Sequence, residues 1–181
     1  MTVDEVPRGP GGIEGEGLTL VPWNGELLRG MANWRERGFP YGAFDMGFLR
    51  DPARFAEFSA RVRNDTRHVH FAAVEGDAPV GRVSVNLQDP AGLYLWGVHV
   101  PPEHEGQGVC RRMLTALIAW LAVERPNEGL VLSANTFAER ALRAYLALGF
   151  VPFVELDVVK SVAAAGIGGA MTTKKAYGPE L

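Results

Sequence analysis

A glycine turn at the start of a helix is the stretch of this sequence best suited to bind an anion. Residues 93–100 (LYLWGVHV) read as a strand, residues 105–110 (EGQGVC) as a turn with two glycines, and residues 111–121 as a helix. The first N–H groups of a helix have no partners within it, and the helix dipole is positive at that end. The stretch therefore predicts a site for a phosphate group of a cofactor.

A second candidate is the aromatic loop of residues 38–47 (GFPYGAFDMG), which has no regular periodicity. Its rings, Phe39, Tyr41 and Phe44, stand beside the carboxylate of Asp45. Such a loop suits the binding of a cationic or aromatic amine. The same side chains could also pack beneath the loop and complete the core; the two interpretations are not exclusive, and the sequence leaves both open.

Other kinds of site have little support in the sequence. His68 and His70 share one face of a strand, but a metal site needs a further ligand that we do not find, so we expect no metal. The Gly-Lys-Ser/Thr of a nucleotide phosphate loop is absent, as is the Gly-x-Gly-x-x-Gly dinucleotide fingerprint.

The elements before the glycine turn follow from periodicity and turn residues. We expect helices over 26–37, capped by Asn24, and over 53–64, started by Asp51 or Pro52. Strands are expected over 18–23, 68–74, 80–87 and 93–100, the last three as a meander.

After the turn, the helix that begins at Arg111 ends near residue 125, before Pro126. Residues 130–134 (LVLSA) then form a strand parallel to 93–100, because a crossover helix joins the two. A helix over 136–148 follows, with capping-box spacing between Thr136 and Glu139. Strands over 151–159 and 170–175 enclose a glycine-rich loop of residues 161–169.

Composition bounds the function. A chain of 181 residues with 47% apolar residues fits one domain, expected over 18–181 behind a flexible tail of residues 1–17 that contains five glycines. The formal charge of −3 argues against nucleic acid as a partner. The apolar runs are too short to span a membrane. With one cysteine no internal disulfide can form, so we expect a cytoplasmic location.

Two segments of the sequence resemble the GCN5-related N-acetyltransferase (GNAT) superfamily. Residues 105–110 are similar to its Arg/Gln-x-x-Gly-x-Gly/Ala pyrophosphate loop, and residues 138–150 to its Asn-x-x-Ala-x-x-x-Tyr…Gly-Phe region. The resemblance implies an α/β fold: a mostly antiparallel central sheet flanked by helices, whose fourth and fifth strands run parallel and splay around the cofactor.

Three residues depart from the family pattern. Glu105 stands at the usual Arg or Gln, Cys110 at the last Gly or Ala, and Ala138 at the usual Asn, with Asn135 one turn earlier. A carboxylate beside a pyrophosphate repels it by about 1 kcal/mol at an exposed position. We expect Arg111 and Arg112 to offset that charge, and Cys110 to be a small packed residue.

The resemblance implies an acetyl-CoA-dependent N-acetyltransferase that acts directly on a primary amine of a small molecule or protein, and it leaves a homodimer open. The residues expected at the cofactor are Val98, Val100, Glu105, Gly106, Gln107, Gly108, Val109, Cys110, Arg111 and Asn135. Backbone groups of Val98 and Val100 would pair with the pantetheine arm, and N–H groups from Gly106 to Arg111 would hold the pyrophosphate. The alternative is a non-catalytic acyl-CoA-binding or interaction module with the same fold.

Tyr145 stands at the family's general-acid position, although a tyrosine there could also be a core residue. Candidates for the acceptor site are Phe39, Tyr41, Phe44, Asp45, Tyr94 and Trp96. The general base is not assigned: Asp45 or Asp89 could act through water, and His99 has a suitable intrinsic pKa. Strand alternation places His99 on the opposite face from Val98 and Val100, unless a bulge intervenes.

Overall fold

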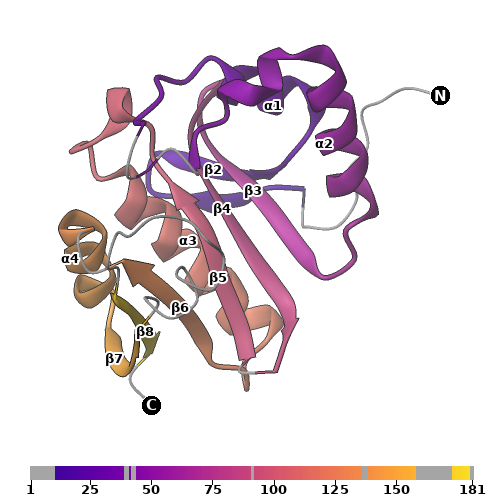
Figure 1. The fold of residues 1–181 in the computed structure, drawn as a ribbon. Helices are drawn as coiled ribbons and strands as arrows, with labels where there is room; N and C mark the ends of the chain where they lie inside the picture. Colours follow the sequence, from indigo (N-terminus) through magenta and orange to yellow (C-terminus); the bar gives the residue numbers. More distant parts are fainter. Residues whose placement is uncertain are drawn as a thin grey trace.

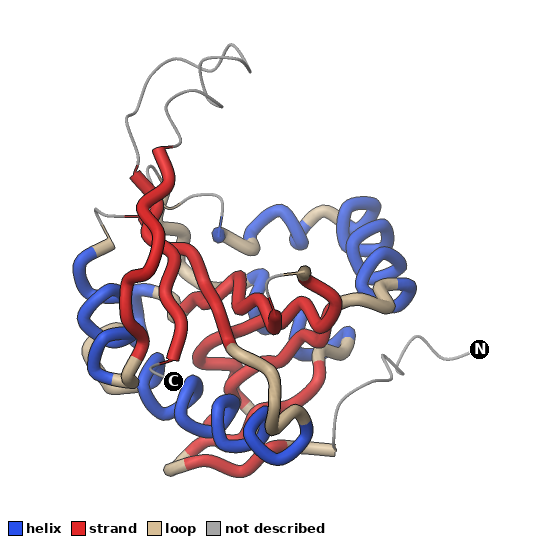
Figure 2. The backbone as a smooth tube through the Cα atoms, turned by 90° about the horizontal axis from the view of Figure 1, so that it is seen from below, coloured by secondary structure: helices blue, strands red, loops and turns tan. Residues whose placement is uncertain are grey.

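The computed structural model describes residues 11–38, 41, 44–90, 92–135, 138–157 and 173–179, with backbone only for 153–157 and 173–179. Within these residues eight strands form one mixed sheet in the order β1-β2-β3-β4-β5-β6-β8-β7. Helices lie on both sides of the sheet (Figures 1 and 2). The strands are β1 (Ile13–Gly15), β2 (Leu18–Pro22), β3 (His68–Glu75), β4 (Ala78–Asp89), β5 (Gly92–His99), β6 (Leu130–Asn135), β7 (Phe150–Asp157) and β8 (Thr173–Pro179).

The first strand corrects one expectation. Ile13 to Gly15 form β1, which pairs antiparallel with β2, and Ile13 is buried. Residues 13–15 are therefore part of the sheet, residues 16 and 17 form the turn to β2, and neither belongs to a flexible tail, because Ile13 gives this segment an apolar side chain to bury. Residues 1–10 lie outside the described residues.

Helices α1 (Gly25–Ala32) and α2 (Pro52–Asn64) cover one face of the sheet. Both predicted caps are confirmed: Asn24 Oδ1 accepts the N–H of Leu27 at 2.8 Å, and Asp51 accepts those of Ala53 and Arg54. α1 ends at Ala32, earlier than the expected residue 37. The chain then turns back to the sheet, where Trp34 Nε1 donates to the carbonyl of Pro79 at 2.9 Å.

Helices α3 (Val109–Glu124) and α4 (Glu139–Ala147) lie on the other side. The core between α3 and the sheet contains Met113, Leu117, Phe71, Val83 and Leu95, all at most 1% exposed. Residue Ala138 precedes α4 with no side-chain cap, so the expected start at a Thr136 capping box is wrong; Thr136 itself lies outside the described residues. Gly149, at φ 84°, ends this helix segment in the left-handed conformation, as predicted.

The parallel pair β5–β6 is confirmed, but it is short. Leu93 to Leu95 pair with Leu130 to Leu132, and every other neighbouring pair in the described sheet is antiparallel. The other edge of β6 pairs with β8 from Leu132 to Asn135, and no pairing with β5 is present beyond Leu132 in this described part of the sheet. β5 and β6 therefore separate at their carboxyl ends.

A bulge in β5 accompanies this separation. Ser84 pairs with Trp96 and Arg82 pairs with His99, so Gly97 and Val98 together oppose Val83. Gly97 has φ 62°, and a Cβ there would lie 3.1 Å from Nη1 of Arg82. Glycine is required at this bulge by both the backbone conformation and the close contact.

No helix within the described ranges is long and apolar enough to cross a membrane.

Candidate active site

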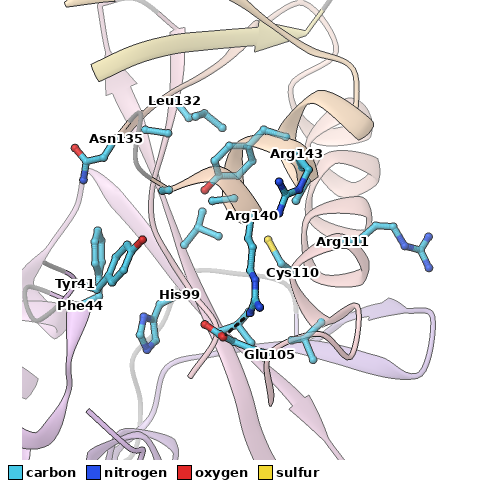
Figure 3. A pocket seen from close by; sticks show the side chains of 18 of the residues that line it. Tyr41, Phe44, His99, Glu105, Cys110, Arg111, Leu132, Asn135, Arg140 and Arg143 are labelled. Atoms are coloured by element: carbon cyan, nitrogen blue, oxygen red, sulfur yellow. Dashed lines mark hydrogen bonds and ion pairs between the residues drawn. The ribbon is translucent and has the colours of Figure 1, made fainter. Parts of the chain in front are cut away.

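A cavity of about 710 Å³ opens where β5 and β6 separate (Figure 3). It passes through the sheet, because its lining comes from both faces: Cys110 and Tyr145 from the side of α3 and α4, and Phe44 and Trp96 from the other side. The predicted site residues that line it are Tyr41, Phe44, Trp96, Val98, Val100, Glu105, Gly106, Gly108, Val109, Cys110, Arg111, Asn135 and Tyr145.

The glycine turn forms one end of the cavity. Gly106 and Gly108 have φ values of 76° and 73°, and a Cβ built on either would meet no atom within 4 Å. Both glycines line the cavity, so the space above them is available to a ligand that approaches the backbone. The unpaired N–H groups of the first turn of α3 belong to this end, which fits a phosphate group.

Gln107 is the exception within the turn. Its side chain does not line the cavity, because Nε2 donates to the carbonyl oxygen of Glu103 at 3.0 Å. The predicted contact of Gln107 with the cofactor is through its backbone N–H, which stays a candidate.

The carboxylate of Glu105 is neutralised, but not by the expected residues. Its Oε1 forms an ion pair with Arg37, and its Oε2 lies 2.9 Å from Nη1 of Arg140 on α4 (Figure 3). Arg111 instead contacts Glu16 at 3.3 Å, and Arg112 contacts Glu75 at 2.6 Å. The local charge at Glu105 is thus balanced by two arginines from segments far apart in the sequence.

Tyr145 and Cys110 both line the cavity. Tyr145 is 6% exposed, and burial, with a smaller contribution from Cys110, raises its pKa well above its usual range. Burial also raises the pKa of the Cys110 thiol to about 11. At neutral pH both groups therefore hold their protons: the phenol can act as an acid, and the thiol is a weak nucleophile.

The opposite end of the cavity is aromatic, with Tyr41, Phe44, Trp96 and His99 in its lining. Figure 3 shows Tyr41, Phe44 and His99 on the far side of the cavity from Arg111. The aromatic loop is thus a cavity wall, as one of the two interpretations predicts, although Phe39 lies outside the described residues.

Asp45 and Tyr94, both predicted at the acceptor site, do not line the cavity. The Asp45 carboxylate accepts the backbone N–H groups of Arg37 and Gly38 at 2.9 and 3.1 Å. The Tyr94 hydroxyl is hydrogen-bonded to Oγ of Ser133. Both side chains are occupied by contacts that hold the loop and the strand in place.

His99 contacts the loop side of the sheet, as strand alternation predicts, with its ring 5.5 Å from Trp34 and 6.2 Å from Phe44. It still lines the cavity, because the cavity extends through the sheet. Burial, and then the charges of Arg82 and Arg37, lower its pKa to about 3. His99 is therefore neutral and a weak base, able to accept a hydrogen bond.

The carbonyl of Val100, a predicted partner of the cofactor, already accepts a hydrogen bond from Arg37 Nη2. Arg37 thus contacts both Val100 and Glu105, the strand end and the glycine turn. Sequence reasoning missed Arg37 and Arg140, since no local pattern distinguishes them from other surface arginines. The glycine inside the apolar strand at position 97 was a usable signal for the bulge.

The chain matches one protein family over most of its length. The model of the acetyltransferase (GNAT) family matches residues 28–150, which include the glycine turn, both separated strands and Tyr145. No curated protein sequence matches the chain.

Solved structures share the fold at low sequence identity. A spermidine N-acetyltransferase chimera from Vibrio cholerae and hSSAT has a TM-score of 0.70 and 18% identity, over 91% of this chain and 95% of the other. The ribosomal-protein-S5-alanine acetyltransferase from Vibrio fischeri has a TM-score of 0.62 and 16% identity, over 92% and 94%. A protein assigned as a streptothricin acetyltransferase from Bacillus anthracis, in complex with acetyl coenzyme A, has a TM-score of 0.55 and 16% identity, over 65% and 66%.

Proposed function

The chain belongs to the acetyltransferase (GNAT) family, and we propose that it transfers the acetyl group of acetyl-CoA directly to a primary amine of a small molecule or a protein. One observation carries this proposal. The cavity between β5 and β6 passes through the sheet, with the glycine turn at one end and aromatic side chains at the other. Two substrates can therefore enter separately and meet beside Tyr145.

The residues at the glycine turn fit acetyl-CoA. The backbone of Gly106 and Gly108 is open to the cavity, and Arg111, Arg140 and Arg143 add positive charge to the lining. A pyrophosphate would receive the N–H groups of the first turn of α3. The adjoining backbone of Val98, at the β5 bulge, is a candidate partner for the amide groups of the pantetheine arm.

Acetyl-CoA supplies a thioester carbonyl as electrophile and a thiol as leaving group. The protein holds the thioester and the amine together, which removes much of the entropic barrier. Tyr145 keeps its phenol proton at neutral pH and is the candidate to protonate the departing sulfur. Transfer is direct in this proposal, because Cys110 stays protonated and is a poor acceptor of the acetyl group.

The amine must be neutral to attack. We propose that it loses its proton to water, and that the neutral His99 ring accepts a hydrogen bond from it. Its low pKa makes His99 a positioning group and not a strong base.

The test combines binding and turnover. Calorimetry should show that acetyl-CoA binds, and a thiol reagent should detect free CoA when a suitable amine is added. Binding without thiol release across a broad panel of amines and peptides would favour a non-catalytic acyl-CoA-binding module. Absence of binding would contradict the assignment of the cavity.

A further inference from the structure

The aromatic end of the cavity, formed by Tyr41, Phe44, Trp96 and His99, is the part of the site that selects the acceptor if the proposed function holds. Trp96 is 40% exposed, so a bound molecule can cover its ring and bury apolar surface. The rings of Phe44 and His99 are stacked at 6.2 Å with an interplanar angle of 18°. This wall is suited to a flat or apolar body.

Negative charge is scarce around that end. The cavity lining contains four arginines and two glutamates, and both glutamates are ion-paired. Glu105 pairs with Arg37 and Arg140, and Glu139 lies 3.6 Å from Arg143. Among the side chains that the structure describes, none offers this cavity a carboxylate without an arginine partner.

The acidic residue of the aromatic loop does not change this balance. Asp45 accepts two backbone N–H groups and does not line the cavity.

Positive charge, by contrast, lies within and behind the aromatic wall. Arg37 lines the cavity, and its guanidinium lies over the Tyr41 ring, 5.6 Å from the ring centre. The face of this ring is therefore already occupied by a cation. Arg82 is 6% exposed, and it donates to the carbonyl of Phe44 at 3.2 Å. In the described part of the chain Arg82 forms no ion pair, so its charge acts on the wall without a neighbouring counter-ion. The pKa of His99 is lowered first by burial and then by Arg82 and Arg37, whose effect exceeds the opposite effect of Asp45.

We propose that the acceptor is a primary amine whose remaining part is uncharged and aromatic or apolar, and that polyamines are poor acceptors. This inference rests on the proposed function. A polyamine would bring a second cation to a wall that offers it arginines and no available carboxylate, which is unfavourable. A single amine with an aromatic body would bury its ring against Phe44 and Trp96, and its nitrogen would point into the gap between β5 and β6. The similarity to the spermidine N-acetyltransferase chimera, at 18% identity, is a similarity of fold.

The first experiment compares kcat/KM, by thiol release at saturating acetyl-CoA, for 2-phenylethylamine and spermidine at one pH. We expect 2-phenylethylamine to be favoured by at least about tenfold, since binding differences of this kind act on transition-state affinity. Equal rates, or a preference for spermidine, would overturn the inference and leave the proposed function intact. If acetyl-CoA fails to bind, or if neither amine nor a broader panel releases thiol, the proposed function fails and this inference with it.

The second experiment changes the charge at the wall. Arg37→Gln removes the cation and frees one oxygen of Glu105, so the ratio of kcat/KM for spermidine to that for 2-phenylethylamine should rise by at least about fivefold. Arg35→Gln is the matched control, because Arg35 is exposed and does not line the cavity. An equal change in both rates for the Arg37 variant would contradict the inference.

The third experiment changes the aromatic surface. Phe44→Leu should lower kcat/KM for 2-phenylethylamine several-fold, with little effect on acetyl-CoA affinity measured by calorimetry. Phe48→Leu is the control, since Phe48 is 37% exposed and lies outside the cavity lining. The same loss in both variants would show that the wall does not select the acceptor.

Discussion

Arg140 Nη1 on α4 lies 2.9 Å from Oε2 of Glu105, the first residue of the glycine turn. Arg37 forms an ion pair with the other oxygen of the same carboxylate. Glu105 is thus shared by the loop after α1 and by α4, and it stands where related enzymes usually have Arg or Gln. This arrangement explains how a carboxylate can occupy the entrance of the proposed phosphate site.

Replacing Glu105 with Gln is expected to strengthen acetyl-CoA binding. The substitution removes a negative charge near the phosphates and releases Arg37 and Arg140, a change worth about 1 kcal/mol and so about fivefold in Kd. Calorimetry at low and high salt should show the gain shrinking as salt screens it. Glu103→Gln is the control, because the Glu103 carboxylate accepts a hydrogen bond from the backbone N–H of Arg35 and does not line the cavity. Weaker binding by the Glu105 variant would show that the carboxylate organises the turn.

Tyr145→Phe is expected to lower kcat by about 10²-fold and to leave the Kd for acetyl-CoA nearly unchanged, because only the proton donor is lost. Tyr94→Phe is the matched control: its hydroxyl bonds Ser133 on the neighbouring strand, and its side chain does not line the cavity. Thiol release under saturating substrates measures the effect. A Tyr145→Phe enzyme with normal turnover would rule out the acid role.

Gly108→Val is expected to abolish acetyl-CoA binding. The residue has φ 73°, so any side chain strains the backbone by about 1–2 kcal/mol, and its Cβ projects into the space where the phosphates would lie. Gly76→Val separates the two effects, since Gly76 also has a positive φ, 60°, and open space around it, but lies in the β3–β4 turn outside the cavity lining. Both variants should lose similar thermal stability, and only the Gly108 variant should lose binding. Normal binding by a folded Gly108→Val protein would refute the phosphate site.

Much of this site is predictable from local sequence. The turn at 105–110, the helix behind it and the parallel strand over 130–134 depend on short-range patterns, and the structure confirms each. The spacing of Tyr145 from Gly149 and Phe150, in the segment that resembles the GNAT superfamily, singles it out as a site residue. In the structure Tyr145 lines the cavity.

The rest depends on contacts between distant segments. Glu105 meets Arg37 and Arg140 across 68 and 35 positions of sequence, and no local pattern encodes such pairs. Asp45 has the right chemistry for an acceptor site, but the backbone N–H groups of its own loop take its carboxylate. Periodicity cannot distinguish a carboxylate that faces a ligand from one that closes a turn.

Two buried histidines should make the protein less stable in mild acid. Burial lowers the pKa of His70 to about 4 and that of His99, assisted by Arg82 and Arg37, to about 3. In the unfolded chain both would titrate near the ordinary value of 6.5. As the pH falls below 6.5 the unfolded state therefore binds more protons than the folded state, and the free energy of unfolding decreases; above pH 7 the two histidines contribute no pH dependence.

The expected loss is on the order of 1–2 kcal/mol for each histidine between pH 6.5 and pH 5. Denaturant titrations at several pH values across this range measure it. His70→Asn, whose amide can keep the hydrogen bond that Nδ1 makes with Ser84 at 2.8 Å, should remove about half of the slope. An unchanged slope in this variant would show that His70 is not the titrating group, and a stability that is flat from pH 7 to 5 in the unaltered protein would show that neither histidine is held neutral by the fold.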